Sequence, residues 1–419
     1  MDLLRFATAG SVDDGKSTLI GRLLYDSKQV FEDTMASLRR ASEAQGLEEV
    51  NLALLTDGLR AEREQGITID VAYRYFATPK RKFIIADSPG HVQYTRNMVT
   101  GASTADLALI LVDARKGVVS QTRRHSAICS LLGIRHLVLC INKMDLVDWS
   151  QSVVNEIAAD FKQLSDHLGV ETVTVMPVAA AAGDNVVDAS VHMPWYSGPT
   201  LLEFLESVEV ADPAEHAALR FPVQYVIRPL TNEYHDYRGY AGTIAAGSVA
   251  SGQEVLVLPI GVRTTVTSVD RYDQMDGAGD SGDAVTIRLA DDIDLGRGGM
   301  IVDATTPATS ATRFTADLCW MSEGQPLKAG QQFWLKHTTR RVRCVVQSLD
   351  DRLEVESFER TANPESFPLN EIGRVTIRTM EPVFVDRYEI SRDTGSFILI
   401  DTATRRTVAA GMVREVATA

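Results

Sequence analysis

Residues 10–17 constrain the fold more than any other stretch of this chain. They read Gly-Ser-Val-Asp-Asp-Gly-Lys-Ser and fit the phosphate-loop pattern GxxxxGK(S/T). A strand-like run, residues 6–9, precedes the pattern, and a helix-compatible run, residues 18–24, follows it. Because this is the context that the pattern requires, we predict a nucleotide-binding domain built on a strand, a loop and a helix.

Each residue type in the loop has a physical role. Glycines let backbone N–H groups turn toward phosphate oxygens, and the helix that follows offers the positive end of its dipole. Lys16 can reach the terminal phosphates, and the Ser17 hydroxyl can ligate Mg²⁺. The residues that we expect to line the nucleotide here are Gly10, Ser11, Val12, Asp13, Asp14, Gly15, Lys16, Ser17 and Thr18.

The chain up to about residue 212 alternates strand-like and helix-like segments. Short, continuous apolar runs predict strands that are buried on both faces. These runs are residues 6–9, 83–86, 107–112, 137–141 and 173–178. Between the first two lies a long stretch rich in helix formers, residues 27–64. The alternation predicts an α/β domain whose mostly parallel sheet has helices on both faces.

A DxxG motif follows the run 83–86, with Asp87 and Gly90 at its ends. The Asp87 carboxylate can hold the magnesium shell, and the Gly90 N–H can contact a γ-phosphate. Taken alone, this short motif is more often a simple turn.

An NKxD motif follows the run 137–141 and contains Asn142, Lys143 and Asp145. The Asp145 carboxylate offers two acceptors to N1–H and the 2-amino group of guanine, a pair of donors that adenine lacks. The alternative reading of Asp145 alone is a helix cap. However, all three motifs follow the carboxyl ends of predicted strands, where open α/β sheets bind ligands. Their order and placement therefore predict a guanine-nucleotide-binding domain.

Two further elements complete the expected site. Thr68 lies between the phosphate loop and DxxG, where the first switch segment of such a domain belongs, so we expect it to close on Mg²⁺ when γ-phosphate is present. The alternative is a β-branched residue at the start of a strand, residues 69–76. The element that contacts guanine through backbone N–H should follow the run 173–178. The residues there are Ala179, Ala180 and Ala181, which carry no side-chain chemistry of their own.

Beyond residue 212 the sequence changes to alternating β-branched strands with Gly and Pro turns. A second break falls near residues 305–307. We predict three domains: a GTP-binding domain over residues 1–212, a β-barrel over 213–306 and a second β-barrel over 307–419. The predicted barrel strands are residues 223–227, 254–258, 264–269 and 285–289, then 333–336, 342–347, 375–378 and 397–400.

Charge limits the partners of this chain. The 42 Lys and Arg residues against 56 Asp and Glu residues give a net charge of −14, so no broad positive field exists to attract phosphodiester backbones. The basic cluster 339–343 alternates with apolar residues, as on the solvated face of a strand. Nucleic acid is therefore an unfavoured partner.

The composition, 45% hydrophobic and 23% charged, is that of a soluble globular protein. No apolar run approaches the roughly 18–20 residues of a membrane helix, and the N-terminus lacks the basic start of a signal peptide. The four cysteines show no CxxC spacing, which favours buried thiols over a metal site or disulfides. We expect a cytoplasmic protein that does not bind membranes.

The order of motifs, with two all-β domains behind, resembles the translational GTPases of the elongation factor Tu type. The sequence is still more similar to the GTPase subunit of heterodimeric bacterial sulfate adenylyltransferase. The closer resemblance rests on residues 9–18 with 23–27, 56–73, 96–103 and 395–401. In the phosphate loop, Ser-Val-Asp-Asp stands where elongation factors carry His-Val-Asp-His. In the guanine-contacting element at residues 179–181, called the fifth motif below, three alanines replace the family's Ser-Ala-Leu, and the Ala180 N–H is the expected guanine donor.

This resemblance implies a function and a partner. A smaller catalytic subunit that binds ATP and sulfate would form adenylylsulfate, and this chain would bind GTP with Mg²⁺ and couple GTP hydrolysis to that uphill step. His91, directly after DxxG, matches the histidine that orients the attacking water in the resembled GTPases, so the expected catalytic residues are His91, Lys16 and Thr68. The expected metal ligands are Ser17, Thr68 and Asp87. The chain has no second phosphate-loop pattern, so we expect no adenylylsulfate kinase activity from it.

Two other functions remain open from the sequence. One is a translation factor that delivers aminoacyl-tRNA, which the net charge and the phosphate-loop variant disfavour. The other is a nucleotide-dependent scaffold without useful hydrolysis. A small ATP-binding subunit in a pull-down supports the sulfate-activating function, whereas tRNA or ribosomes support the translation factor.

Overall fold

The computed structural model describes residues 2–27, 52–55, 70–90, 95–210, 217–229, 237–271, 277–354 and 357–416. Most of the predicted helical stretch 27–64, together with Thr68 and His91, lies outside these residues. The chain divides into two units, Met1–Val210 with Glu354–Glu359, and Ala211–Leu353 with Arg360–Ala419. The three domains expected from the sequence, with boundaries after residues 212 and 306, stay predictions.

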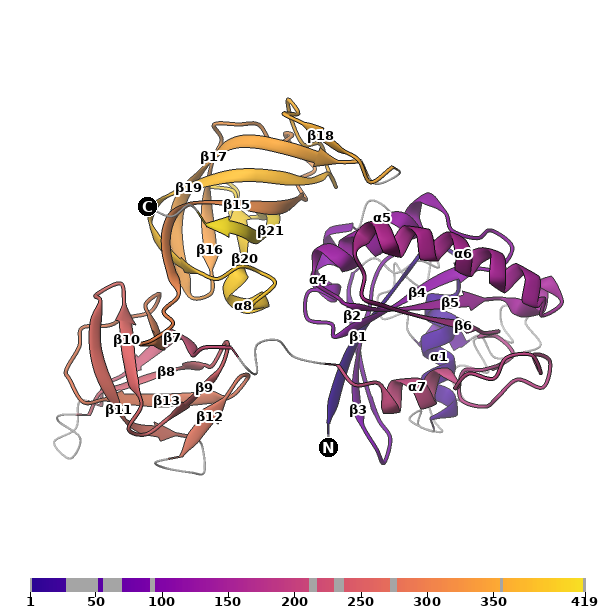
Figure 1. The fold of residues 1–419 in the computed structure, drawn as a ribbon, viewed down its shortest axis with the longest axis horizontal. Helices are drawn as coiled ribbons and strands as arrows, with labels where there is room; N and C mark the ends of the chain where they lie inside the picture. Colours follow the sequence, from indigo (N-terminus) through magenta and orange to yellow (C-terminus); the bar gives the residue numbers. More distant parts are fainter. Residues whose placement is uncertain are drawn as a thin grey trace. The chain divides into compact units, whose positions relative to one another are not determined.

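The first unit is built on one six-stranded sheet with the order β2-β3-β1-β4-β5-β6 (Figure 1). β2 runs antiparallel to β3, and the other neighbours are parallel. The strands are β1 (Leu3–Gly10), β2 (Ala72–Ala77), β3 (Lys82–Asp87), β4 (Leu107–Asp113), β5 (His136–Asn142) and β6 (Thr172–Pro177). Four of the five apolar runs that the sequence singles out in this part lie within strands of this sheet, and the fifth, 173–178, extends one residue beyond β6, so this part of the prediction is confirmed.

Helices cover both faces of this sheet. In Figure 1, α4, α5 and α6 lie along one side and α1 and α7 along the other. The helices are α1 (Lys16–Asp26), α4 (Thr95–Ala102), α5 (Ser120–Leu131), α6 (Gln151–Leu168) and α7 (Leu201–Ser207), with 3₁₀ turns η1 (Leu52–Leu55) and η3 (Met144–Val147). All seven residues of β4 are buried, which explains its uninterrupted apolar sequence.

The helices begin and end where their sequences favour it. α7 starts with a capping box, because the Thr200 side chain accepts the Glu203 N–H and the Glu203 carboxylate accepts the Thr200 N–H. α6 ends at Gly169, whose φ of 65° is left-handed and suits glycine.

No described helix combines the length and the apolar character that crossing a bilayer requires.

The second unit is antiparallel. A closed barrel has the strand order β10-β11-β13-β8-β7-β14, and β9 pairs with β12 beside it. The strands are β7 (Arg220–Ile227), β8 (Gly239–Thr243), β9 (Ser248–Ala250), β10 (Glu254–Leu258), β11 (Val262–Asp270), β12 (Ala278–Asp280), β13 (Ala284–Leu289) and β14 (Met300–Asp303). Fifteen buried side chains, among them Phe221, Tyr240 and Ile287, form its core.

A seven-stranded antiparallel sheet follows, with the order β16-β20-β21-β15-β19-β17-β18. The additional pairing of β16 with β17 closes its first six strands into a ring. The elements are β15 (Thr309–Trp320), β16 (Gln332–His337), β17 (Arg340–Leu353), β18 (Arg360–Ala362), β19 (Ile372–Val385), α8 (Arg392–Gly395), β20 (Ser396–Ile400) and β21 (Thr407–Val416). In β17, Arg341 and Arg343 are exposed and Val342 is buried, as expected for the basic cluster 339–343. The predicted fold class, an α/β domain followed by antiparallel barrels, is confirmed.

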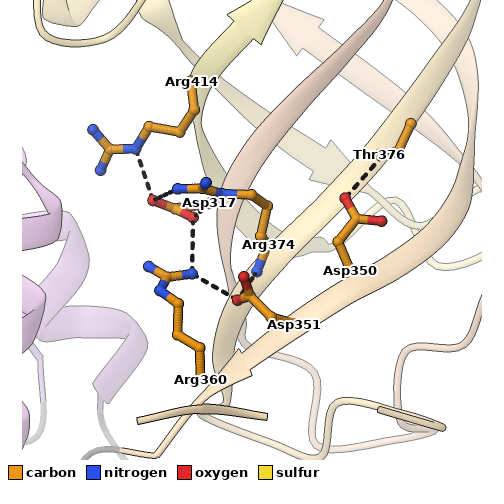
Figure 2. A network of polar contacts seen from close by, with 7 residues as sticks. All are labelled: Asp317, Asp350, Asp351, Arg360, Arg374, Thr376 and Arg414. Carbon is orange, nitrogen blue, oxygen red and sulfur yellow. Dashed lines mark hydrogen bonds and ion pairs between the residues drawn. The ribbon is translucent and has the colours of Figure 1, made fainter. Parts of the chain in front are cut away.

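Three arginines from different strands converge on Asp317 of β15 (Figure 2). The Arg414 Nε donates to Asp317 Oδ2 at 2.7 Å, the Arg374 Nε donates to Oδ1 at 3.0 Å, and Arg360 forms an ion pair at 3.5 Å. The Asp317 side chain is only 3% exposed. Burial alone would raise the pKa of Asp317, but the hydrogen bond from Arg374 and the three positive charges hold it below the ordinary value. This cluster ties β15 to β18, β19 and β21.

We expect Asp317→Asn to lower the free energy of unfolding of the second unit by about 1–3 kcal/mol, because a hydrogen bond to a charged group contributes about that much to stability. Urea unfolding followed by tryptophan fluorescence measures it. The matched control is Glu254→Gln, which removes an exposed ion pair with Arg263 in the same unit and should leave the midpoint almost unchanged. Equal effects of the two changes would contradict a stabilising role for the Asp317 cluster.

Candidate functional site

The phosphate-loop residues connect the end of β1 to the start of α1, as predicted. Gly15 has a φ of 93°, and a Cβ at this position would lie 2.3 Å from the Asn142 Nδ2. Both the left-handed backbone and this close approach require glycine. Ser17 and Thr18 lie half-buried in the first turn of α1, Val12 is half-buried in the loop, and Asp13 is exposed.

The Lys16 ammonium lies inside this loop. Its Nζ donates to the Gly10 carbonyl at 3.0 Å and to the Ser11 carbonyl at 2.8 Å, and the residue is 7% exposed. Burial lowers the pKa of Lys16, and the nearby charges of Asp87, Asp14 and Asp13 oppose that shift. A buried ammonium among carbonyl groups is a strong donor for an anion that replaces those contacts.

The DxxG motif lies against the same lysine. A Cβ on Gly90 would approach the Lys16 Nζ to 2.5 Å and the Gly10 carbonyl oxygen to 3.0 Å, so the backbone of residue 90 touches the phosphate loop. Asp87 ends β3, and its Oδ1 accepts the Thr8 hydroxyl of neighbouring β1 at 2.9 Å. Parallel pairing of β1 with β3 therefore brings the two motifs together, as the sequence predicted.

Asp14 closes the phosphate loop on itself. Its Oδ2 accepts the Ser11 N–H at 2.6 Å, and the residue is 1% exposed. Burial raises the pKa of Asp14, although the Ser11 hydrogen bond and the Lys16 charge oppose it. The aspartate that replaces the second histidine of elongation factors thus holds the loop's own backbone.

The NKxD motif joins three parts of the site through Asn142. Its Nδ2 donates to the Asp14 carbonyl at 2.8 Å, and its Oδ1 accepts the Ala180 N–H at 3.0 Å. Lys143, in a left-handed conformation, donates to the Asp13 carbonyl at 2.5 Å. Asp145 is half-buried in η3. The motif therefore connects the phosphate loop to the fifth motif.

Asp113, at the end of β4, supports this arrangement. Its carboxylate accepts a hydrogen bond from the Arg115 Nη2 at 2.6 Å and forms an ion pair with the Lys143 Nζ at 3.1 Å. Burial alone would raise the pKa of Asp113, but the Arg115 hydrogen bonds and the Lys143 charge hold it well below its usual range. The sequence offered one signal for this residue, an acidic side chain directly after a predicted strand.

The fifth motif, Ala179 to Ala181, follows β6. Ala179 and Ala180 are buried and Ala181 is exposed. The Ala180 N–H, which we expected to face guanine, donates to Asn142 instead, so its role as a guanine donor stays a prediction. Arg22 of α1 donates a hydrogen bond to the Ala180 carbonyl of this segment, a role that the sequence did not predict.

Thr68 and His91 are outside the described residues, so their expected roles also stay predictions.

His125 of α5 is a second residue that sequence reasoning missed. Its Nδ1 accepts the Gly10 N–H at 3.0 Å, and its Nε2 lies 2.7 Å from the Gln121 side-chain nitrogen. An accepting Nδ1 carries no proton, so the ring is neutral with its proton on Nε2, which donates to the Gln121 side-chain amide once that amide is turned to present its oxygen. Burial, together with the Lys16 and Arg124 charges, lowers the pKa of His125 to about 3 from the ordinary 6.5.

We expect this histidine to make stability depend on pH. Between pH 6.5 and 3 the unfolded chain binds a proton that the folded chain does not, so the free energy of unfolding falls as pH falls through that window. In His125→Gln this contribution is absent, and the fall from pH 7.5 to 5.5 should be smaller by about 1 kcal/mol. Urea unfolding at both pH values measures the difference, with His167→Gln on the exposed part of α6 as control. Parallel pH profiles for wild type and His125→Gln would contradict this.

Comparison with known proteins identifies the family. The elongation factor Tu GTP binding domain family matches residues 1–212, and the GTP-eEF1A C-terminal domain-like family matches residues 313–414. Sulfate adenylyltransferase subunit 1 of Yersinia enterocolitica is 51% identical over 416 residues, which cover 99% of this chain and 86% of that protein. The chain belongs to the sulfate adenylyltransferase subunit 1 family.

Other relatives agree with this assignment. Sulfate adenylyltransferase subunit 1 of Erwinia tasmaniensis is 52% identical over 416 residues, 99% of this chain and 86% of that protein. The bifunctional enzyme CysN/CysC of Mycobacterium tuberculosis is 56% identical over 411 residues, 98% of this chain and 67% of that enzyme. For this member of the subunit 1 family, the predicted resemblance is confirmed over nearly the whole chain.

Proposed function

We propose that this chain is the GTPase subunit of a cytoplasmic sulfate adenylyltransferase. It binds GTP and couples GTP hydrolysis to the synthesis of adenylylsulfate from ATP and sulfate by a smaller catalytic subunit. The observation that supports this most strongly is the 51–56% identity to subunit 1 proteins and CysN/CysC over at least 98% of the chain. The convergence of three nucleotide motifs on Lys16 and Asn142 agrees with it.

The residues of the loop fit a nucleotide phosphate and its magnesium ion. Lys16 presents a buried ammonium, and Gly15 and Gly90 let the backbone approach Asn142 and Lys16 more closely than a Cβ would allow. Ser17 and Asp87 offer the hydroxyl and carboxylate oxygens that Mg²⁺ prefers, and Thr68 would add a second hydroxyl in the GTP state. When bound, Mg²⁺ neutralises charge on the β- and γ-phosphates.

The chain's own residues then have separate tasks. Lys16 turns from the Gly10 and Ser11 carbonyls to the phosphates, and the Gly90 N–H faces the γ-phosphate. Asn142 holds the loop and the fifth motif together, while Asp145 binds N1–H and the 2-amino group of guanine. Hydrolysis requires positioning and charge stabilisation, with His91 orienting the attacking water.

Asp145→Asn should shift nucleotide preference from GTP toward xanthosine triphosphate, because the substitution replaces one acceptor by a donor. We expect GTP affinity to fall on the order of 10²-fold, as expected when a charged hydrogen-bonded pair is lost. Competitive calorimetry with both nucleotides measures the shift. The control is Asp148→Asn, three residues away and exposed, which should leave both affinities unchanged. Unchanged GTP affinity in Asp145→Asn would remove Asp145 from base recognition.

The coupling itself is tested with the complex of this chain and its catalytic subunit. GTP turnover and adenylylsulfate are measured with and without sulfate, ATP and the partner. We expect GTP turnover to rise only when all components are present, and adenylylsulfate to accumulate beyond the level reached without GTP. Equal adenylylsulfate yields with and without GTP would overturn the coupling. Co-purification of tRNA or ribosomes in place of the small subunit would favour a translation factor.

A further inference from the structure

The four alanines from 179 to 182 form a turn that offers no polar side chain to fix its orientation. The Gly183 N–H donates to the Ala179 carbonyl at 2.8 Å, which closes one helix-like turn. In such a turn the backbone N–H groups point to its start and the carbonyl groups point to its end. Groups outside the turn must therefore hold its two ends.

The start of the turn meets the NKxD motif. Asn142 Oδ1 accepts the Ala180 N–H at 3.0 Å, and Asn142 precedes the predicted guanine ligand Asp145 by three residues. The next N–H along the turn, that of Ala181, points to the same end. A 6-oxo group of a base held by Asp145 would find this donor there.

The carbonyl end of the turn meets Arg22. The Arg22 Nε donates to the Ala180 carbonyl at 3.2 Å, and its Nη2 donates to the Ala181 carbonyl. The Arg22 side chain is 19% exposed, and its Nη1 lies 3.6 Å from Asp26 Oδ1 in the next turn of α1. A planar guanidinium with two donors to successive carbonyls fixes the rotation of both peptide groups.

We propose that Arg22 is a positioning residue for guanine recognition. By holding the carbonyls of Ala180 and Ala181, it fixes the direction of the peptide N–H groups of Ala181 and Ala182, because N–H and C=O of a trans peptide point in opposite directions. Arg22 thereby sets the preference for a 6-oxo purine, although it does not touch the base. The inference rests on the proposed function, since it requires that the chain bind a guanine nucleotide.

The test compares GDP with 6-thio-GDP, which keeps N1–H and the 2-amino group and replaces O6 by a weaker acceptor. Affinities are measured by calorimetry for wild type, Arg22→Met and Asp26→Asn. Methionine spans a similar length without donors, and Asp26→Asn removes only the ion pair of Arg22. We expect wild type and Asp26→Asn to prefer GDP about 5- to 10-fold, the worth of one hydrogen bond. In Arg22→Met, GDP affinity should fall about 10-fold, and the ratio of GDP affinity to 6-thio-GDP affinity should approach one.

The ratio of GDP affinity to 6-thio-GDP affinity distinguishes a positioning role of Arg22 from a general structural role. A loosened fold weakens both nucleotides equally and leaves the ratio unchanged, so a wild-type ratio in Arg22→Met overturns the inference. If Arg22→Met does not fold, Arg22→Lys carries the test, because one remaining donor should give an intermediate ratio. Absence of GDP binding by the wild-type chain contradicts the proposed function itself. GDP binding with an undiminished 6-oxo preference in both Arg22 variants contradicts only the role of Arg22.

Discussion

Lys16→Ala should bind GDP and GTP at least 10³-fold more weakly than the wild-type protein. The Lys16 ammonium is buried and contacts two loop carbonyls, so a phosphate that replaces those carbonyls gains a charge-assisted hydrogen bond in a poorly solvated place. Alanine removes that donor and leaves the carbonyls of Gly10 and Ser11 without it. Titration calorimetry with GDP and GTP in the presence of Mg²⁺ measures the loss.

The matched control is Lys82→Ala. Lys82 is exposed at the first residue of β3, whereas the phosphate loop lies near the last residue of that strand. This variant should bind both nucleotides as wild type does. Because Lys16 also lines the loop, circular dichroism and urea unfolding must first show that Lys16→Ala is folded. A folded Lys16→Ala protein with wild-type GDP affinity would exclude Lys16 from phosphate binding.

The sequence predicted the convergence of Gly10, Asp87 and Asn142 because simple rules govern it. Each residue ends one of the mutually parallel strands of the sheet, and parallel strands bring their carboxyl ends to one edge. The strands themselves were visible as apolar runs, because both faces of β1, β4 and β5 are buried.

His125 and Arg22 were not predictable in the same way. Each contacts its backbone partner across more than 100 residues of sequence, His125 with Gly10 and Arg22 with Ala180. Both lie on helices where a polar side chain is ordinarily solvent-exposed, and neither belongs to a motif with a fixed spacing. Only the packing of α1 and α5 against the sheet gives these side chains their partners.

In the second unit the sequence reasoning found strands but not their full extent. β19 continues through Pro382, where strand rules predict an end, because its pairing with β15 shifts register between Ala311 and Arg313. β15 itself was missed, since its first residues, Thr309 and Ser310, are polar and exposed. Strand pairing across long sequence separations decides both cases.

His91→Ala should keep GTP affinity near wild type and lower single-turnover GTP hydrolysis on the order of 10²-fold or more, a typical size for the loss of one positioned catalytic group. The physical reason is that His91 directly follows Gly90, which lies against the predicted phosphate-binding lysine. Gly90 approaches the Lys16 ammonium so closely that a Cβ would lie 2.5 Å from it, and His91 follows Gly90 directly in the sequence. An imidazole there can accept a hydrogen bond from the attacking water or, when protonated, offset charge on the γ-phosphoryl group.

Rapid-quench measurement of one GTP turnover separates this chemical step from product release, and calorimetry gives the affinity. The control is His167→Ala, whose ring lies exposed near the end of α6 and should change neither quantity. The proposed coupling uses the free energy of GTP hydrolysis. The complex carrying His91→Ala should therefore form adenylylsulfate only to the level reached without GTP, although its catalytic subunit is intact. GTP hydrolysis at the wild-type rate in that complex would remove His91 from the mechanism. Slow hydrolysis with undiminished adenylylsulfate accumulation would keep His91 as a catalytic residue and refute the coupling.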